Sequence, residues 1–243
     1  MASRGVDDVH GNLPALEAVL AELDLDREPV DAIVCGGDLL WGPYQSECLA
    51  LLRARDARFL TGNCERQVLG EIDESHAWCA GRLSDTERAF VGRWPATVEL
   101  KIDGLGRVLF CHGSPRSDEE ILTMLTPELA ASEGLAGVTA DVVVIGHTHQ
   151  QFDRPVGAMR LVNAGSVGLP YEGQAGAFWA LLGPEVEFRA TLYDIAAAAE
   201  SLRTSGMPGI DDLLGDSLLE PAPRDEVTAY FEQQRAHVET DSP

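Results

Sequence analysis

The chain contains 243 residues, and its 18 Lys and Arg residues against 40 Asp and Glu residues give a formal net charge of −22 at pH 7. Hydrophobic residues make up 45% of the sequence and charged residues 24%, a globular composition that excludes disorder of the whole chain. No run reaches the roughly 18 apolar residues of a membrane span, and the start of the chain lacks a signal-peptide core. We therefore expect a cytoplasmic protein without a membrane partner.

The charge balance and the cysteines narrow the possible partners. Affinity for nucleic acid comes largely from clustered Lys and Arg, so nucleic acid is an unexpected partner for this acidic chain. The acidity does not exclude a phosphorylated substrate, because a metal centre can place positive charge locally. The five cysteines form no CxxC pair and are odd in number, which predicts reduced thiols in the cytosol rather than a disulfide framework.

Strands and helices alternate along the first part of the sequence, which predicts an α/β body. Apolar residues at positions 13, 16, 19, 20 and 23 have the spacing of an amphipathic helix. Apolar runs that end at glycine, at 30–35 and 141–145, are typical of buried strands. We expect strands over 4–7, 30–35, 58–60, 97–102, 108–111 and 141–145, and two or three more strands between 160 and 192. We expect helices over 13–23 and 46–55, and a third helix from the capping box at Ser84 toward Trp94.

The chain becomes helical after residue 193. Asp194 can cap a helix over 195–203, glycines at 206 and 209 end it, and an amphipathic helix fits 225–237. We therefore expect a body over residues 1–193 and a helical C-terminal extension over residues 194–243. The extension would pack on the body, cover its cleft or build a homo-oligomer.

Five short motifs lie where predicted strands end, which is where α/β sheets place their functional sites. Each motif alone is weak evidence for a functional site, because Gly-Asp pairs are common and Gly-His-Thr-His could also form a solvated turn. Together they contain four of the six histidines, two aspartates and two asparagines, and this mixture of oxygen and imidazole ligands suits Mn, Fe or Zn. The motifs are Asp8-Val9-His10-Gly11-Asn12, Gly37-Asp38, Gly62-Asn63-Cys64-Glu65, Cys111-His112-Gly113 and Gly146-His147-Thr148-His149.

In this order the motifs resemble those of the calcineurin-like metallophosphoesterases, specifically the small bacterial and archaeal phosphodiesterase branch. The resemblance extends from Asp8 to about Tyr171 and includes Gly42-Pro43 and the segment 162–168. It implies a four-layer αββα sandwich of two mixed sheets flanked by helices, with a dimetal site at the strand ends. This fold is α/β in class, or α+β by some schemes.

The resemblance also implies a role for each motif residue. Manganese is the expected metal, with Fe, Zn or Ni as alternatives, and a hydroxide that bridges two ions would attack the phosphorus of a small phosphoester. One metal would be held by Asp8, His10 and His149, and the second by Asn63, His112 and His147, with Asp38 as the bridge. The expected catalytic residues are Asp38, Asn63, Cys64 and His112.

Three departures from the family pattern refine this expectation. Cys64 stands where most members of the superfamily carry a histidine, which predicts weaker help for a poor leaving group. The first strand, over 4–7, is polar and contains Gly5, which is unfavourable for a central strand. The segment 37–43 lacks the arginine of the superfamily's phosphoprotein phosphatases, so a phosphodiesterase is the expected activity.

Two other classes of function stay open. The enzyme could instead be a phosphomonoesterase, a protein phosphatase or a dinucleoside polyphosphate hydrolase, or the fold could serve as a non-catalytic scaffold. Outside the motifs, Trp41 and Tyr171 could wall the substrate cleft, and Arg116 and Arg154 could reach a phosphate. His76 lies outside every motif, and we expect it to be solvated.

Overall fold

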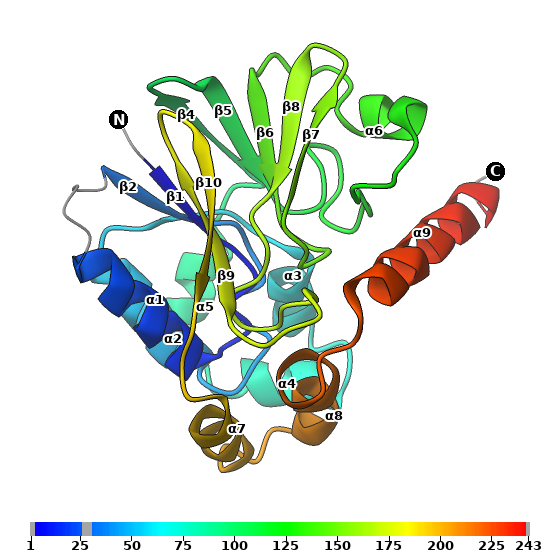
Figure 1. Cartoon of the computed structure of the whole chain (residues 1–243). Coiled ribbons are helices and arrows are strands. Elements are labelled where there is room, and N and C mark those ends of the chain that lie inside the picture. The colour runs from blue at the N-terminus through cyan, green and yellow to red at the C-terminus, as the bar shows by residue number, and fades with distance from the viewer. Residues whose placement is uncertain (1–2, 26–30, 242–243) are drawn as a thin grey trace.

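The computed structural model describes residues 3–25 and 31–241, and its strands form two five-stranded sheets that lie face to face (Figure 1). The predicted start of the second strand, at residue 30, lies outside the described residues. The first sheet has the strand order β10-β9-β1-β2-β3, in which β1, β2 and β3 are parallel. Its strands are β1 (Ser3–Val6), β2 (Ala32–Cys35), β3 (Arg58–Phe59), β9 (Ala177–Leu182) and β10 (Val186–Thr191).

The second sheet has the order β4-β5-β6-β8-β7, with β5, β6 and β8 parallel and antiparallel strands at both edges. Parallel strands place their carboxyl ends at one edge of a sheet, so the loops that follow them gather there. The strands are β4 (Thr97–Ile102), β5 (Gly106–Cys111), β6 (Val142–Ile145), β7 (Phe152–Val156) and β8 (Met159–Asn163).

Three layers of buried side chains confirm the four-layer αββα sandwich. The first layer lies between the outer helices and the first sheet and includes Leu16 and Trp179. The second lies between the sheets around Phe110, and the third packs Val143 of the second sheet near Ala131. The helices that cover the sheets include α1 (Leu13–Leu25), α2 (Gln45–Arg53), α5 (Asp85–Val91) and α6 (Glu128–Gly134).

The predictions of individual elements were correct where the apolar pattern is strong. Helix α1 buries Leu16, Val19, Leu20 and Leu23, as its spacing requires, and the Ser84 capping box opens α5. The sequence did not predict α3 (Asn63–Gly70), α4 (Glu74–Ala80), α6 or β7. Strand β7 contains Pro155 and lies at the sheet edge, where a missing backbone N–H is tolerated but the strand signal is weak.

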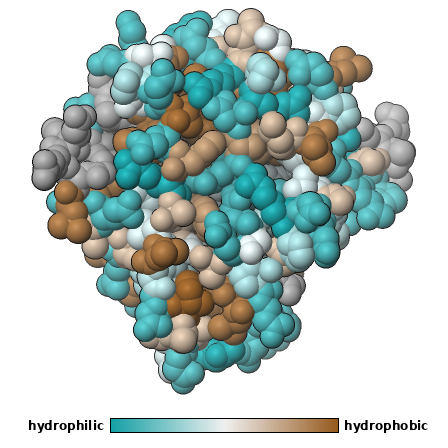
Figure 2. Space-filling model, in the orientation of Figure 1, coloured by the Kyte–Doolittle hydropathy of each residue, from teal (hydrophilic) through white to brown (hydrophobic). Residues whose placement is uncertain are grey.

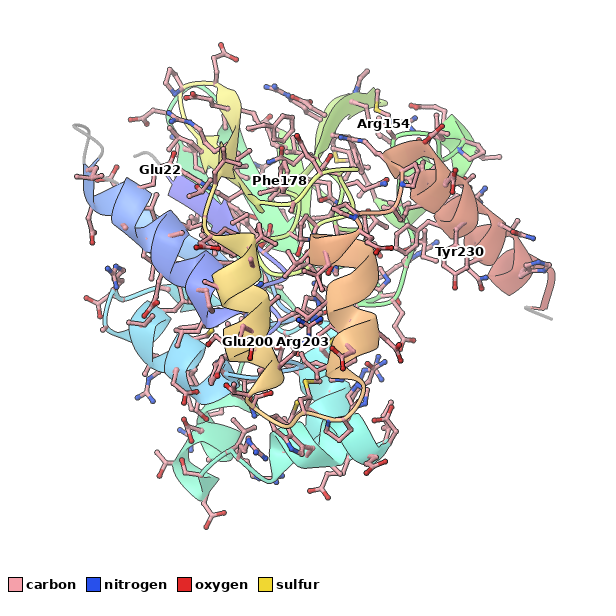
Figure 3. All side chains as sticks on the ribbon, turned by 60° about the horizontal axis from the view of Figure 1, so that its bottom comes forward. Glu22, Arg154, Phe178, Glu200, Arg203 and Tyr230 are labelled. Carbon is pink, nitrogen blue, oxygen red and sulfur yellow. The ribbon has the colours of Figure 1, made fainter. Side chains whose placement is uncertain are left out.

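The C-terminal extension has two parts. Asp194 accepts a hydrogen bond from the Ala197 N–H and caps α7 (Ile195–Arg203), as predicted. Helix α7 lies beside α8 (Ile210–Leu214) and the π-helical turn η1 (Gly215–Leu219), and their buried side chains join the core layer that contains α1 and α2 (Figure 3). Helix α9 (Arg224–Asp241) follows and projects from the body at the opposite side from α1 (Figure 1).

The surface agrees with the composition. Hydrophilic residues cover most of the face in Figure 2, and hydrophobic residues gather there in a few small groups. No helix in the described part of the chain is long and apolar enough to cross a membrane.

Strand β1 occupies the centre of the first sheet in spite of its polar sequence. It pairs with β2 on one side and β9 on the other, where Gly5 lies opposite Val34 and Ala180. A Cβ atom on Gly5 would lie 3.5 Å from the Ala164 Cβ, an ordinary contact. A Cβ atom on Gly36 would instead lie 1.6 Å from the Asp7 Oδ1 atom.

The two glycines therefore predict opposite effects of alanine. We expect Gly5→Ala to raise the free energy of unfolding by about 0.4–1 kcal/mol, because it restricts the unfolded chain without a clash. Gly36→Ala should lower the free energy of unfolding, because the buried Asp7 side chain must move. Urea denaturation of both variants checks this, and a similar loss of stability in both would contradict the packing described for β1.

Candidate metal centre

The five motifs meet at one point because each follows a parallel strand. Backbone hydrogen bonds join the loops: the His10 N–H donates to the Asp38 carbonyl at 2.9 Å, and the Gly146 N–H donates to the His112 carbonyl at 2.9 Å. The Asp8 N–H donates to the Gly37 carbonyl at 3.2 Å. These bonds fix the distances between neighbouring loops within each sheet before any side chain contributes.

Most of the residues predicted to hold metal have left-handed backbone conformations. The φ angles are 53° at Asp8, 47° at His10, 51° at Asp38, 64° at His147 and 56° at His149. Such angles are uncommon outside glycine, cost of order 1–3 kcal/mol each, and concentrate at functional sites. The strained backbone turns each side chain from its strand toward a common centre.

The side chains form two groups of possible metal ligands that share one residue. Asp8, His10, Asp38 and His149 make the first group, and Asp38, His112 and His147 the second, with the ligand atoms of each group within 4.8 Å of one another. The Asn63 Oδ1 atom lies 3.1 Å from the His112 Nε2 atom, which places it beside the second group. The structure thus brings together all seven residues that the sequence predicts as ligands, and Asp38 occupies the shared position.

Backbone carbonyls orient three of the histidines. The Nδ1 atoms of His10, His112 and His149 lie 3.2, 2.9 and 2.7 Å from the carbonyl oxygens of Trp41, Gly36 and Leu169, respectively. A carbonyl can only accept, so we assign the proton of each ring to Nδ1, where it donates to the carbonyl. The Nε2 lone pairs then face the centre, in the arrangement that metal-binding histidines adopt.

The resulting contacts suit a cation. The Nε2 atoms of His10 and His149 lie 3.2 Å apart, and the Nε2 atom of His112 lies 3.1 Å from the Asn63 carbonyl oxygen. With the protons of His10 and His149 on Nδ1, the contact between their Nε2 atoms sets two lone pairs against each other, which is repulsive. A divalent ion that accepts both lone pairs converts the repulsion into coordination, so these residues fit a dimetal site.

The protonation of the site follows from burial and neighbouring charges. Burial and the nearby His149 lower the pKa of His10 to about 4, and burial and His112 lower the pKa of His147 to about 4. Burial alone would lower the pKa of His112, but the Asp38 carboxylate outweighs it and raises the value to about 10. A proton and a metal therefore compete for the His112 lone pair, which makes metal affinity fall as the pH decreases.

Glu65 is a supporting residue whose role the sequence did not reveal. Its buried carboxylate accepts hydrogen bonds from the backbone N–H groups of Asp38, Leu39 and Gly62, each at 2.8 Å. Burial and then the Asp38 charge raise the pKa of Glu65 to about 7. Its position as the third residue of α3, from which its carboxylate accepts from the N–H of the N-cap residue Gly62, was the signal that could have identified it.

Cys64 contacts the shared carboxylate directly. Its Sγ atom donates to the Asp38 Oδ2 atom at 3.0 Å, and its N–H donates to the Oδ1 atom at 2.8 Å. Burial, together with the Asp38 charge, raises the pKa of the Cys64 thiol well above its usual range, so the group stays protonated. The thiol therefore acts as a neutral hydrogen-bond donor to Asp38.

A cleft of about 230 Å³ opens onto these residues. Trp41 and Tyr171 line it, as predicted, but the expectation that His76 is solvated was wrong. His76 is buried because its ring stacks on Trp41, with the ring centroids 5.7 Å apart. The lining residues are His10, Asp38, Trp41, Asn63, Cys64, Gln67, His76, His147, His149, Leu169, Tyr171 and Phe231.

None of the described residues that line this cleft is Lys or Arg. The two arginines proposed for phosphate contacts are engaged elsewhere. Arg116 forms two hydrogen bonds with the Glu120 carboxylate, and Arg154 donates to the carbonyls of Met124 and Thr126. The prediction that either arginine reaches a phosphate in this cleft therefore finds no support in the geometry.

Comparisons with known proteins agree with the fold. A family model described as the calcineurin-like phosphoesterase superfamily domain matches residues 1–182. The uncharacterized protein MJ0912 of Methanocaldococcus jannaschii is 27% identical over 242 residues, which cover 88% of this chain and 95% of that protein. A metallophosphoesterase from Sphaerobacter thermophilus is 25% identical, with a TM-score of 0.70 over 88% of this chain and 98% of its own. The hypothetical protein PH1004 from Pyrococcus horikoshii OT3 shares the fold, with a TM-score of 0.74 at 17% identity over 91% of this chain and 99% of its own.

The hydrogen bonds of Glu65 predict that its loss destabilises the protein. Glu65→Ala leaves several buried N–H groups without an acceptor, so we expect the free energy of unfolding to fall by about 3–5 kcal/mol. Glu65→Gln keeps one carbonyl oxygen and should lose less. Urea denaturation measures both, with the exposed Glu99→Gln as the control. Losses below about 0.5 kcal/mol in both Glu65 variants would refute this role.

Proposed function

Since the chain belongs to the calcineurin-like phosphoesterase superfamily, we propose that it is a dimetal phosphodiesterase that hydrolyses one ester bond of a small phosphodiester. The observation that carries the proposal is the pair of ligand groups that share Asp38. The first metal would be held by Asp8, His10 and His149, the second by Asn63, His112 and His147, and Asp38 would contact both. When bound, two divalent ions neutralise charge on the phosphoryl oxygens and lower the pKa of a coordinated water.

The choice of metal rests on the ligand chemistry. The two groups contain carboxylates and imidazoles, with an amide oxygen beside the second. Hard oxygen ligands mixed with imidazole favour Mn, and Fe, Zn and Ni accept the same donors. We propose Mn as the native metal.

The cleft supports a diester over more highly charged substrates. A phosphodiester carries a single negative charge, whereas a phosphomonoester carries about −1.5 to −2 near neutral pH. No Lys or Arg lies among the described residues of the cleft, so only the metal ions would compensate the charge of a substrate. This arrangement disfavours phosphoproteins and dinucleoside polyphosphates, which carry additional charge that nothing in the cleft would neutralise.

Other residues around the metal centre hold the ligands in position. The Cys64 thiol and N–H fix both oxygens of Asp38, and the backbone carbonyls of Trp41, Gly36 and Leu169 hold the imidazoles in place. The thiol is a weak acid, so it gives a departing alkoxide little help. We therefore propose that the enzyme acts best on esters of acidic alcohols.

The cysteines and the net charge bear on the cellular compartment and the partners of the protein. All five cysteines are buried and unpaired, which suits a reducing compartment, and a cytoplasmic location is part of the proposal. The net charge of −22 favours a small substrate over nucleic acid. A homo-oligomer formed through the C-terminal extension stays a prediction.

Hydrolysis of bis-p-nitrophenyl phosphate tests the proposed function. We expect metal-stripped protein to gain activity with Mn²⁺, and Asp38→Asn to lower kcat/KM by at least about 100-fold, because both ligand groups lose a shared charge. Asp56→Asn is the matched control, since Asp56 also has a positive φ, 52°, but is exposed outside the site. Folded protein with no more activity than Asp38→Asn would favour the scaffold alternative.

Cys64 predicts a dependence on the leaving group. Cys64→His introduces a general acid, so it should accelerate the hydrolysis of alkyl esters, by up to about 10²–10⁴-fold, more than that of nitrophenyl esters. Cys64→Ser keeps a donor to Asp38 and should leave the ratio of the two rates unchanged. Steady-state kinetics on methyl and nitrophenyl diesters give the ratio, and equal acceleration of both by Cys64→His would refute the prediction.

A further inference from the structure

The C-terminal helix contributes a side chain to the cleft. Phe231, on α9, lines it together with residues of the motif loops, although α9 lies beyond the residues that the family model matches. Its ring centroid lies 6.2 Å from that of Tyr171, at an interplanar angle of 57°. The preceding residue, Tyr230, labelled in Figure 3, is 58% exposed and is not part of the lining.

Aromatic rings form two walls of the cleft. On one wall Trp41 stacks on His76, and the Trp41 Nε1–H donates to the Ser75 Oγ atom at 2.9 Å, which fixes the plane of the indole. On the other, Tyr171 stacks on the predicted metal ligand His149, with the ring centroids 5.1 Å apart and an interplanar angle of 11°. The second wall therefore begins at the metal centre.

Hydrogen bonds anchor α9 to the loop that carries His149. The buried Gln150 side chain donates to the Arg224 carbonyl at 2.8 Å and accepts from the Thr228 hydroxyl at 2.7 Å. Arg224 forms an ion pair with Glu172, the residue after Tyr171. The position of Phe231 is thus tied to the two residues that form the second wall.

A further anchor lies one residue after Phe231. The Glu232 carboxylate accepts hydrogen bonds from the hydroxyls of Thr123 and Thr126, both at 2.6 Å. With contacts on both sides of Phe231, the ring is held over the cleft and does not depend on packing alone.

We propose that these aromatic walls, completed by Phe231, bind a flat aromatic or heteroaromatic ring carried by one alcohol of the phosphodiester. The inference rests on the proposed function, which places the phosphoryl group at the metal centre. A cleft of about 230 Å³ leaves space for one ring beside that group. Planar rings gain more than their buried area alone from contacts with aromatic side chains.

Calorimetric titration of the full-length, Mn²⁺-loaded protein tests the ring site without turnover when the probes are phosphonates, whose P–C bond is not hydrolysed. Phenylphosphonate, cyclohexylphosphonate and methylphosphonate share a headgroup but differ in the flatness and size of the group attached to it. We expect phenylphosphonate to bind roughly tenfold more tightly than methylphosphonate, with cyclohexylphosphonate in between. Phe231→Ala should reduce the phenyl preference to about threefold or less, and Tyr230→Ala should leave it unchanged.

Phe231→Leu is a second variant that controls for a folding defect, because it keeps most of the apolar volume. It should lose the preference for phenyl over cyclohexyl. Equal affinities for the three phosphonates, or a phenyl preference that survives Phe231→Ala in folded protein, would overturn the ring site. Hydrolysis is measured separately on bis-p-nitrophenyl phosphate. Activity without a ring preference would refute only this inference, whereas ring binding without activity would refute the proposed phosphodiesterase.

Discussion

The structure depends on one electrostatic constraint: buried carboxylates and imidazoles must turn their lone pairs toward a single centre. Asp8, Asp38 and His112 are almost completely shielded from solvent, and two histidine nitrogens face each other at 3.2 Å. Buried charges without partners cost several kcal/mol each. Divalent cations would satisfy both the carboxylates and the facing lone pairs, which is why the same residues fit two metal ions.

The backbone and the supporting side chains follow from this constraint. Parallel strands from both sheets bring their loops to one place, and left-handed conformations at Asp8 and His10 turn the side chains inward. Glu65 binds three backbone N–H groups around the second and third motifs at 2.8 Å, so the loop that carries Asp38 keeps its strained shape. The strained backbone conformations of the ligand residues therefore persist because the surrounding hydrogen bonds hold them in place. Without that support, the ligand residues would relax to unstrained conformations.

The sequence predicted what local patterns encode and missed what depends on tertiary contacts. The buried strands, α1 and the cap at Asp194 follow from short-range rules, and the motif order placed all seven expected ligands at strand ends. Pro155 weakened the sequence signal of the edge strand β7. His76 was assigned to solvent because its stacking on Trp41 joins segments 35 residues apart, which no local pattern predicts. Phe231 belongs to an amphipathic helix that the sequence predicted, but only the bonds between Gln150 and α9 show that this helix reaches the cleft.

Metal stoichiometry tests the central claim most directly. Full-length protein freed of metal and titrated with Mn²⁺ should bind two ions per chain, because two ligand groups meet at Asp38. Asp38→Asn should lose at least one of them, since it removes the charge that both groups share. Failure of the folded wild-type protein to bind two ions, or two ions bound equally well by Asp38→Asn, would contradict the account.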